Sequence, residues 1–243
     1  MNKKLLLRKS HRYIALIVGV QLFFWSIGGL YFSLIPIDEI HGDHLSVNEK
    51  DVNWISAKRA ISYGELLKVI DSNEIDITEI RDIKFKSIAN HFYYKVILKD
   101  RSFTWINANT SEIAIRLTDT QIKDVALGLS LNAGEISSVE WLTSVEQDSE
   151  YREKALPAYR VNFNGKDNLH MYLDGYSGEL ISMRTTKWRI FDFLWMLHVM
   201  DYETRDNFNH LLLQFFAALA VFTSLTGIAL WTITSRRLKI GSR

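Results

Sequence analysis

Two long uncharged apolar runs bracket this chain, and they constrain its fold more than any other feature of the sequence. They extend from Tyr13 to Ile37 and from Leu211 to Thr234. At about 1.5 Å of rise per residue, an α-helix over either run is long enough to cross a hydrocarbon core of roughly 30 Å. We therefore predict two transmembrane helices, over residues 13–37 and 208–234, with one domain of ordinary size between them.

Basic residues lie just outside both runs: Lys3, Lys4, Arg8, Lys9 and Arg12 before the first, and Arg236, Arg237, Lys239 and Arg243 after the second. By the positive-inside rule, residues 1–12 and 235–243 lie in the cytoplasm and the central domain faces the other side of the membrane. A cleaved signal peptide is the competing interpretation of the first run. That run is much longer than an h-region of about 7–15 residues and has no small-x-small cleavage pattern, so we expect an uncleaved anchor.

Composition narrows the possible functions. The formal net charge is +1, which provides no overall basic field for nucleic acid. The chain has no cysteine, so disulfides, thiolate metal sites and cysteine catalysis are excluded. No phosphate-binding loop, nucleotide fingerprint, serine elbow or zinc-protease motif is found. We therefore do not expect an independent enzyme, although a redox subunit stays open.

The central region contains an internal repeat. Each copy has an alternating strand and then a second strand that ends in an Asn/Asp-x-x-Thr/Ser-x-Glu turn. The two turns run from Asn107 to Glu112 and from Asp174 to Glu179. Asx and Ser/Thr side chains bond the local backbone in such turns.

Matching elements precede the two turns. Segments 56–69 and 119–131 have apolar residues at helix spacing, and Thr118 or Asp119 is a suitable N-cap for the second. Extended stretches, 77–85 and 136–145, follow these segments. Each copy is thus predicted to be helix-strand-strand-strand, and two copies predict an α+β domain.

The unit that ends in Asp174-Gly175-Tyr176-Ser177-Gly178-Glu179 resembles a PepSY repeat. The His11-Arg12-Tyr13 run, the Leu197-His198 pair and the ending from Leu225 to Trp231 are similar to segments of PepSY-associated membrane proteins. The resemblance implies a bacterial inner-membrane protein with a periplasmic domain. That domain would comprise a juxtamembrane segment with a first PepSY-like repeat (38–114) and a second repeat (115–187), held between the two transmembrane helices.

Two functions follow from the resemblance. Some longer relatives are iron-regulated proteins or siderophore reductases that carry b-type haem on membrane histidines, which implies an accessory in electron transfer or in iron or metal uptake. Other PepSY units resemble inhibitory pro-segments of secreted peptidases, which implies a module that binds a partner protein. A reductase, a receptor or a peptidase is the partner expected.

Three histidines near the membrane ends are candidate haem ligands. Haem ligation needs two neutral imidazoles on opposite sides of the porphyrin. His198 and His210, or His210 from two protomers, could provide them at the outer leaflet, and His11 from two protomers could hold an inner haem. The alternatives are an interfacial role for His11 and a hydrogen bond at the helix start for His210.

A divalent metal site is a second chemical possibility. His41 and His44, with Asp38 or Asp43, offer nitrogen and oxygen ligands suited to zinc, iron or copper. The two histidines are close in sequence with glycine between them, so both could turn toward one ion. A solvated loop is the alternative.

Small residues lie along one face of each predicted span: Ala15, Gly19, Ser26, Gly29 and Ser33 in the first, and Ala217, Ala220, Ser224 and Gly227 in the second. Small residues allow close helix packing in lipid, either between these two helices or in a homodimer. Gln21 lies within the first span and needs a polar partner, for which Thr223 or Ser224 is expected. Residues 188–202 predict a short amphipathic helix at the membrane interface.

Overall fold

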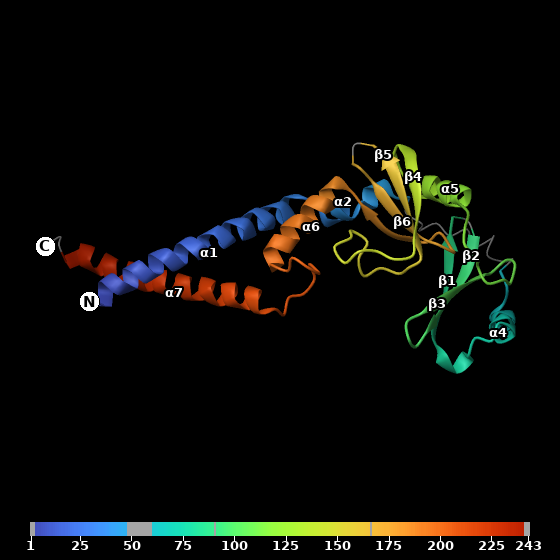
Figure 1. Ribbon diagram of the computed structural model, residues 1–243, viewed down its shortest axis with the longest axis horizontal. Helices are drawn as coiled ribbons and strands as arrows, with labels where there is room; N and C mark the ends of the chain where they lie inside the picture. Colours follow the sequence, from blue (N-terminus) through green and yellow to red (C-terminus); the bar gives the residue numbers. More distant parts are fainter. Residues whose placement is uncertain (1–2, 48–59, 90, 166, 241–243) are drawn as a thin grey trace. The chain divides into compact units, whose positions relative to one another are not determined.

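The computed structural model describes residues 3–47, 60–89, 91–165 and 167–240. The chain divides into two compact units. The helical unit contains Met1–Ile37 and Arg189–Arg243, and the α+β unit contains Asp38–Trp188. The α+β unit is therefore inserted, in sequence, between the two long helices of the helical unit (Figure 1).

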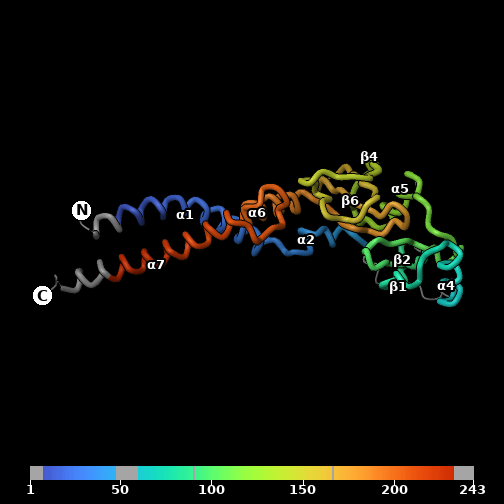
Figure 2. The backbone as a smooth tube through the Cα atoms, turned by 60° about the horizontal axis from the view of Figure 1, so that its bottom comes forward, coloured from blue at the N-terminus to red at the C-terminus, as the bar shows by residue number. Residues whose placement is uncertain are grey.

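Two long helices, α1 (Lys3–Leu34) and α7 (Leu211–Ile240), form most of the helical unit. Pro36 explains where α1 ends, because proline disfavours helical backbone at the residue before it. The helices lie side by side, with the N-terminal end of α1 and the C-terminal end of α7 at the same end of the unit (Figures 1 and 2). The predicted pair of apolar helices is confirmed. However, α1 begins before residue 13 and α7 continues past residue 234.

Both helices contain spans that are long and apolar enough to cross a membrane. They are Arg8–Leu34, with mean hydropathy 1.8, and Leu211–Thr232, with mean hydropathy 2.0. Many of their large apolar side chains are exposed; Leu16 is 68% exposed and Leu225 is 62% exposed. Leaving such a side chain in water rather than burying it costs roughly 1.5–3 kcal/mol. The helices are therefore compatible with a membrane anchor.

The residues of α1 that face the interior form a seam, in which the spacing alternates between three and four residues as in coiled-coil packing. Its buried and half-buried members include His11, Ile14, Val18, Gln21, Trp25, Gly28 and Phe32. This seam coincides with the small-residue faces only in part, because Gly19 and Gly29 of α1 border open space, and Ala217 and Ser224 of α7 are exposed. Gly227 of α7 nevertheless packs against the His11 ring, and Ala15 and Ala220 are half-buried. The expectation that the two helices pack on each other is thus met through part of the small-residue faces, and the homodimer stays a prediction.

The short helix α6 (Thr186–Val199) joins the two units in sequence, where a helix over 188–202 was predicted. Within the helical unit it packs on α1: the rings of Phe32 and Phe191 lie 4.7 Å apart, and a Cβ on Gly28 would lie 3.8 Å from the Leu194 carbonyl oxygen. Gln21 Nε2 donates to the Leu197 carbonyl at 3.1 Å. The predicted partner of Gln21 on α7 is therefore wrong.

The first half of the α+β unit is a helix followed by an antiparallel meander. Ser62 caps α4 (Tyr63–Ser72) through a capping box with Glu65. The three strands, in the order β1-β2-β3, are β1 (Ile80–Ile88), β2 (His91–Leu98) and β3 (Phe103–Asn107). The helix predicted over 56–69 lies partly outside the described residues, and its described part begins at Tyr63 and ends later than predicted.

The second half repeats this order. Thr118 caps α5 (Asp119–Leu129) through a capping box with Gln121, which confirms the predicted N-cap. A four-stranded antiparallel sheet follows, in the order β4 (Glu135–Leu142), β5 (Ala158–Asn164), β6 (His170–Asp174) and β7 (Leu180–Arg184). The predicted α+β class is thus observed. The fourth strand, β7, is absent from the predicted helix-strand-strand-strand unit. The helix α5 and the inward residues of this sheet share one apolar core, which includes Ile122, Tyr159, Val161, Met171 and Leu173.

Candidate functional site

The two turns identified in the sequence share a set of hydrogen bonds. The backbone N–H of Asn107 donates to the Glu112 carbonyl at 2.8 Å, and that of Asp174 donates to the Glu179 carbonyl at 2.8 Å. The side-chain oxygens of Asn107 and Asp174 each accept backbone N–H groups from the two middle residues of their turn. The turns therefore match residue by residue, and Glu112 is the structural equivalent of Glu179.

Glu179 joins the second turn to the first sheet. Its carboxylate accepts from Lys95 Nζ on β2 at 2.9 Å and forms an ion pair with Lys86 Nζ on β1 at 3.0 Å. Burial raises the pKa of Glu179, but the hydrogen bonds and charges of Lys95 and Lys86 together hold that pKa below its usual value. Lys95 also lies over the rings of Phe103 and Trp105, at 4.2 and 4.6 Å from the ring centroids. The Glu179 carboxylate therefore links the two halves of the α+β unit through ion pairs.

Beside the Glu179 ion pairs, the α+β unit contains a cleft of about 430 Å³. This volume lies within the range of roughly 300–1,000 Å³ that is typical of ligand pockets. The lining comes from the β1–β2 hairpin, the turn after β3, the linker 113–117, the first half of α5 and the turn after β6. Both halves of the unit therefore build the cleft.

Specific contacts hold the linker that forms one wall of this cleft. The Leu117 N–H donates to the Gly175 carbonyl at 3.0 Å, and the Tyr159 hydroxyl donates to the Leu117 carbonyl at 2.6 Å. The guanidinium of Arg116 lies 4.1 Å from the Trp141 ring centroid, which anchors the linker on the second sheet. The cleft wall is thus part of the packed structure.

Gly178 brings the second turn close to α5. Its φ is +75°, a left-handed backbone that favours glycine, and a Cβ there would lie 3.1 Å from Val125 Cγ1. Only glycine therefore fits this position without strain.

The rim of the cleft combines acidic and apolar side chains. Glu112 and Asp124 line it, both are exposed, and neither has an ion pair with the described residues. Beside them on the linker, Ile113 is 36% exposed and Ile115 is 82% exposed. His91 lines the same cleft from the start of β2. The site can therefore offer apolar contact together with uncompensated negative charge.

His210 is placed as a structural hydrogen bonder. The Leu213 N–H donates to its Nδ1 at 3.4 Å, so Nδ1 is an acceptor. Nε2, 2.8 Å from the Val199 carbonyl oxygen, is then the donor. Because both ring nitrogens are occupied, His210 must lose these bonds before it can ligate a haem iron.

His198 has a different environment within the helical unit. Its ring stacks on Trp195, with centroids 6.3 Å apart and planes at 9°, and lies 5.6 Å from the Trp25 ring. Its Nδ1 is buried and has no hydrogen-bond partner among the described residues. Burial lowers the pKa of His198 and so favours the neutral ring. The structure brings His198 and His210 to the same end of α6, but it does not place two free imidazoles there.

His11 contacts α7. Its Nδ1 lies 2.8 Å from the Thr226 hydroxyl oxygen, and a Cβ on Gly227 would lie 3.5 Å from its Cε1. The ring therefore packs between the two long helices instead of projecting toward a second protomer. Haem binding by His11, His198 or His210 stays a prediction.

The predicted metal ligands lie at the start of the α+β unit, around α2 (Ile37–His41) and the 3-10 turn η1 (Asp43–Leu45). Asp38, His41, Asp43 and His44 are all exposed. No group of three or more His, Cys, Asp or Glu side chains is gathered in a metal-binding arrangement within residues 3–47, 60–89, 91–165 and 167–240. The metal site stays a prediction.

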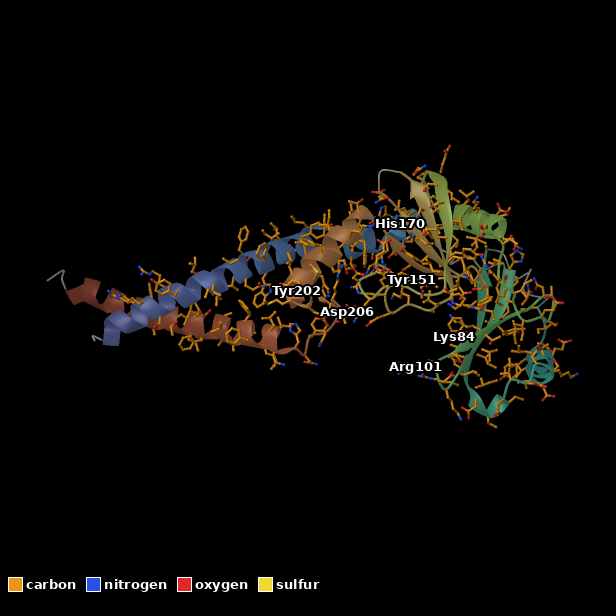
Figure 3. The ribbon with its side chains drawn as sticks, in the orientation of Figure 1. Lys84, Arg101, Tyr151, His170, Tyr202 and Asp206 are labelled. Atoms are coloured by element: carbon orange, nitrogen blue, oxygen red, sulfur yellow. The ribbon has the colours of Figure 1, made fainter. Side chains whose placement is uncertain are left out.

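The sequence analysis did not identify a polar network on the second sheet. Glu150 Oε1 lies 2.5 Å from His170 Nδ1 and accepts from the Tyr172 hydroxyl at 2.8 Å. The rings of Tyr172 and Tyr151 stack with centroids 4.4 Å apart, so the loop that carries Tyr151 lies against the sheet that carries His170 (Figure 3). Burial, together with the Glu150 carboxylate, raises the pKa of Tyr172. The alternation of polar and apolar residues along β6 is the sequence signal that would have identified this face.

Comparison of the chain with known protein families, with curated proteins and with solved structures found no match. The resemblance to PepSY proteins therefore stays a prediction. The functional argument rests on the residues and contacts described above.

Proposed function

We propose that this protein is a membrane-anchored binding module whose cleft takes up a polypeptide segment of a partner protein. In this proposal, the α1–α7 pair is the anchor and the α+β unit is the receptor. The observation that carries it is the cleft of about 430 Å³, in which exposed isoleucines adjoin carboxylates without ion-pair partners among the described residues.

The proposed topology places both chain ends in the cytoplasm. Basic residues precede the first apolar span and follow the second. The N-terminal end of α1 and the C-terminal end of α7 lie together (Figures 1 and 2). The domain would then meet its partner on the other side of the membrane.

Binding is favoured over a haem or metal function by how the histidines are used. His210 employs both ring nitrogens to join α6 to α7, and His11 joins α1 to α7. Their hydrogen bonds account for these two positions without a cofactor. The cleft, by contrast, presents the carboxylates of Glu112 and Asp124 without ion-pair partners among the described residues.

The test is panning of the full chain, in lipid nanodiscs, against a phage library of random peptides. Selected peptides are then measured with Ile115→Asp, which places a charge on the apolar rim, and with Leu127→Asp as the control. Leu127 is 52% exposed on α5 and does not line the cleft. We expect Ile115→Asp to abolish binding and Leu127→Asp to preserve it. If the library yields no enriched peptides, or if both variants bind them equally, the proposal is wrong.

A further inference from the structure

The geometry points to the chemistry of the partner: Glu112 and Asp124 select a segment that carries lysine or arginine side chains beside apolar ones. This inference rests on the proposed function, because it assigns the charge preference of the same cleft.

The first step is an internal precedent. The second turn directs Glu179 at a neighbouring sheet, where its carboxylate holds Lys95 and Lys86 at 2.9 and 3.0 Å. The two lysines come from adjacent antiparallel strands, β2 and β1. A turn of this type therefore presents a glutamate that can bind lysines on an extended backbone beside it.

The second step is the equivalence of Glu112. The first turn repeats the hydrogen bonds that the Asp174 side chain accepts in the second, and also the bond from the first N–H of the turn to the carbonyl of its glutamate. Glu112 thus occupies the position of Glu179, but its carboxylate lines the cleft and has no lysine or arginine partner among the described residues. The first turn thus repeats the position of the glutamate, but no described residue supplies the cation that Lys95 and Lys86 supply to Glu179.

The third step is the rest of the cleft. Asp124 adds a second carboxylate from α5, while Ile113 and Leu117 contribute apolar surface from the linker. Among the described residues no arginine or lysine lines the cleft, so none of them neutralises its carboxylates there. A cationic side chain flanked by apolar ones complements both features at once.

A metal ion is the competing occupant of two carboxylates near an imidazole. His91, Glu112 and Asp124 line the same cleft, yet they are not gathered as a metal-ligating group in the described part of the chain. The apolar linker residues also add nothing to a hydrated ion. The arrangement therefore favours a peptide side chain.

The test uses two fluorescein-labelled decapeptides, one alternating lysine with leucine and valine, and the other with glutamine in place of each lysine. Binding to the full chain in nanodiscs of zwitterionic lipid is followed by fluorescence anisotropy. We expect the lysine peptide to bind more tightly. An exposed ion pair contributes about 0.2–1 kcal/mol, so Glu112→Gln should weaken its binding by roughly 1.5- to 5-fold. If the two effects add, Glu112→Gln with Asp124→Asn should weaken it by up to about 25-fold.

The matched control is Glu146→Gln, which removes one exposed carboxylate of the same unit outside the cleft and should leave binding unchanged. Raising the salt concentration should weaken the lysine peptide and leave the glutamine peptide unaffected. Equal binding of the two peptides, or an equal effect of Glu112→Gln and Glu146→Gln, overturns the inference. If library peptides still bind in an Ile115-dependent manner, the proposed function survives that outcome. If no peptide binds at all, both fail.

Discussion

The ion-pair cluster at Glu179 predicts a specific loss of stability. Glu179→Gln keeps the size of the side chain and removes its charge from between Lys95 and Lys86. The side chains of Lys95 and Glu179 are 19% and 22% exposed, so this pair is worth about 1.5 kcal/mol, at the lower end for hydrogen bonds to charged groups. The Lys86 side chain is 44% exposed, and its pair adds about 0.5 kcal/mol. We expect a total loss of about 2 kcal/mol.

Urea unfolding of the full chain in detergent measures this loss, with tryptophan fluorescence as the signal. For an m-value of about 2 kcal/mol per molar, the unfolding midpoint should fall by about 1 M. A double-mutant cycle with Lys95→Met isolates the pair and should give a coupling free energy of about 1.5 kcal/mol. Glu146→Gln is the control for the loss of an exposed carboxylate.

The reasoning is refuted if Glu179→Gln changes the free energy of unfolding by less than about 0.5 kcal/mol, the range of ordinary surface substitutions. The same result would remove the internal precedent on which the charge preference of the cleft depends. A large loss without coupling to Lys95 would also count against it, because the loss would then not arise from the ion pair.

Three further predictions concern other contacts. The pKa of Glu179 lies below its usual value of 4.5, so the stabilisation that the Glu179 ion pairs provide is present above pH 4.5 and is lost as the pH falls below it. When the free energy of unfolding is measured as the pH is lowered, it should therefore decrease less in Glu179→Gln than in the unmodified protein. Gly178→Ala should destabilise the α+β unit by about 1–3 kcal/mol in urea unfolding, since its φ is +75°, whereas Gly128→Ala, within α5 and facing open space, should be neutral or stabilising. His210→Ala should lower the thermal midpoint of the helical unit by circular dichroism, since about 1–3 kcal/mol is lost when the Val199 carbonyl loses its donor; a b-type haem spectrum that disappears in this variant would instead show ligation.

Local signals in the sequence predicted the elements well. Thr118 or Asp119 was predicted as the N-cap because such a side chain before a helix-spaced segment satisfies a free N–H, and the structure shows Thr118 in that position. The Asp174 turn was likewise predicted from its side-chain pattern, which depends only on neighbouring residues. The strand Leu180–Arg184 was missed because its counterpart in the first repeat is reduced to a single bridge between Ile106 and Ile113, and because it gains its place only by pairing with β6.

The partners of the membrane-span residues could not be predicted in this way. Gln21 donates to the carbonyl of Leu197, a backbone atom that every residue has, so no side-chain pattern marks it. The small-residue rule selected Gly19 and Gly29, although the seam follows the heptad spacing of larger and polar side chains. The cleft was missed because it depends on how two repeats meet, which periodicity within each repeat does not specify.

The polar residues of the spans have a common structural reason. The last carbonyl groups of a helix have no partner within it, and an unpaired carbonyl is costly in an apolar environment. At the end of α6, Gln21 donates to Leu197, Trp25 to His198 and His210 to Val199, at 3.1, 2.8 and 2.8 Å. Two of these donors come from α1, and the third precedes α7. The carbonyl end of α6 therefore ties the two long helices together, which explains polar side chains in apolar spans without requiring a cofactor.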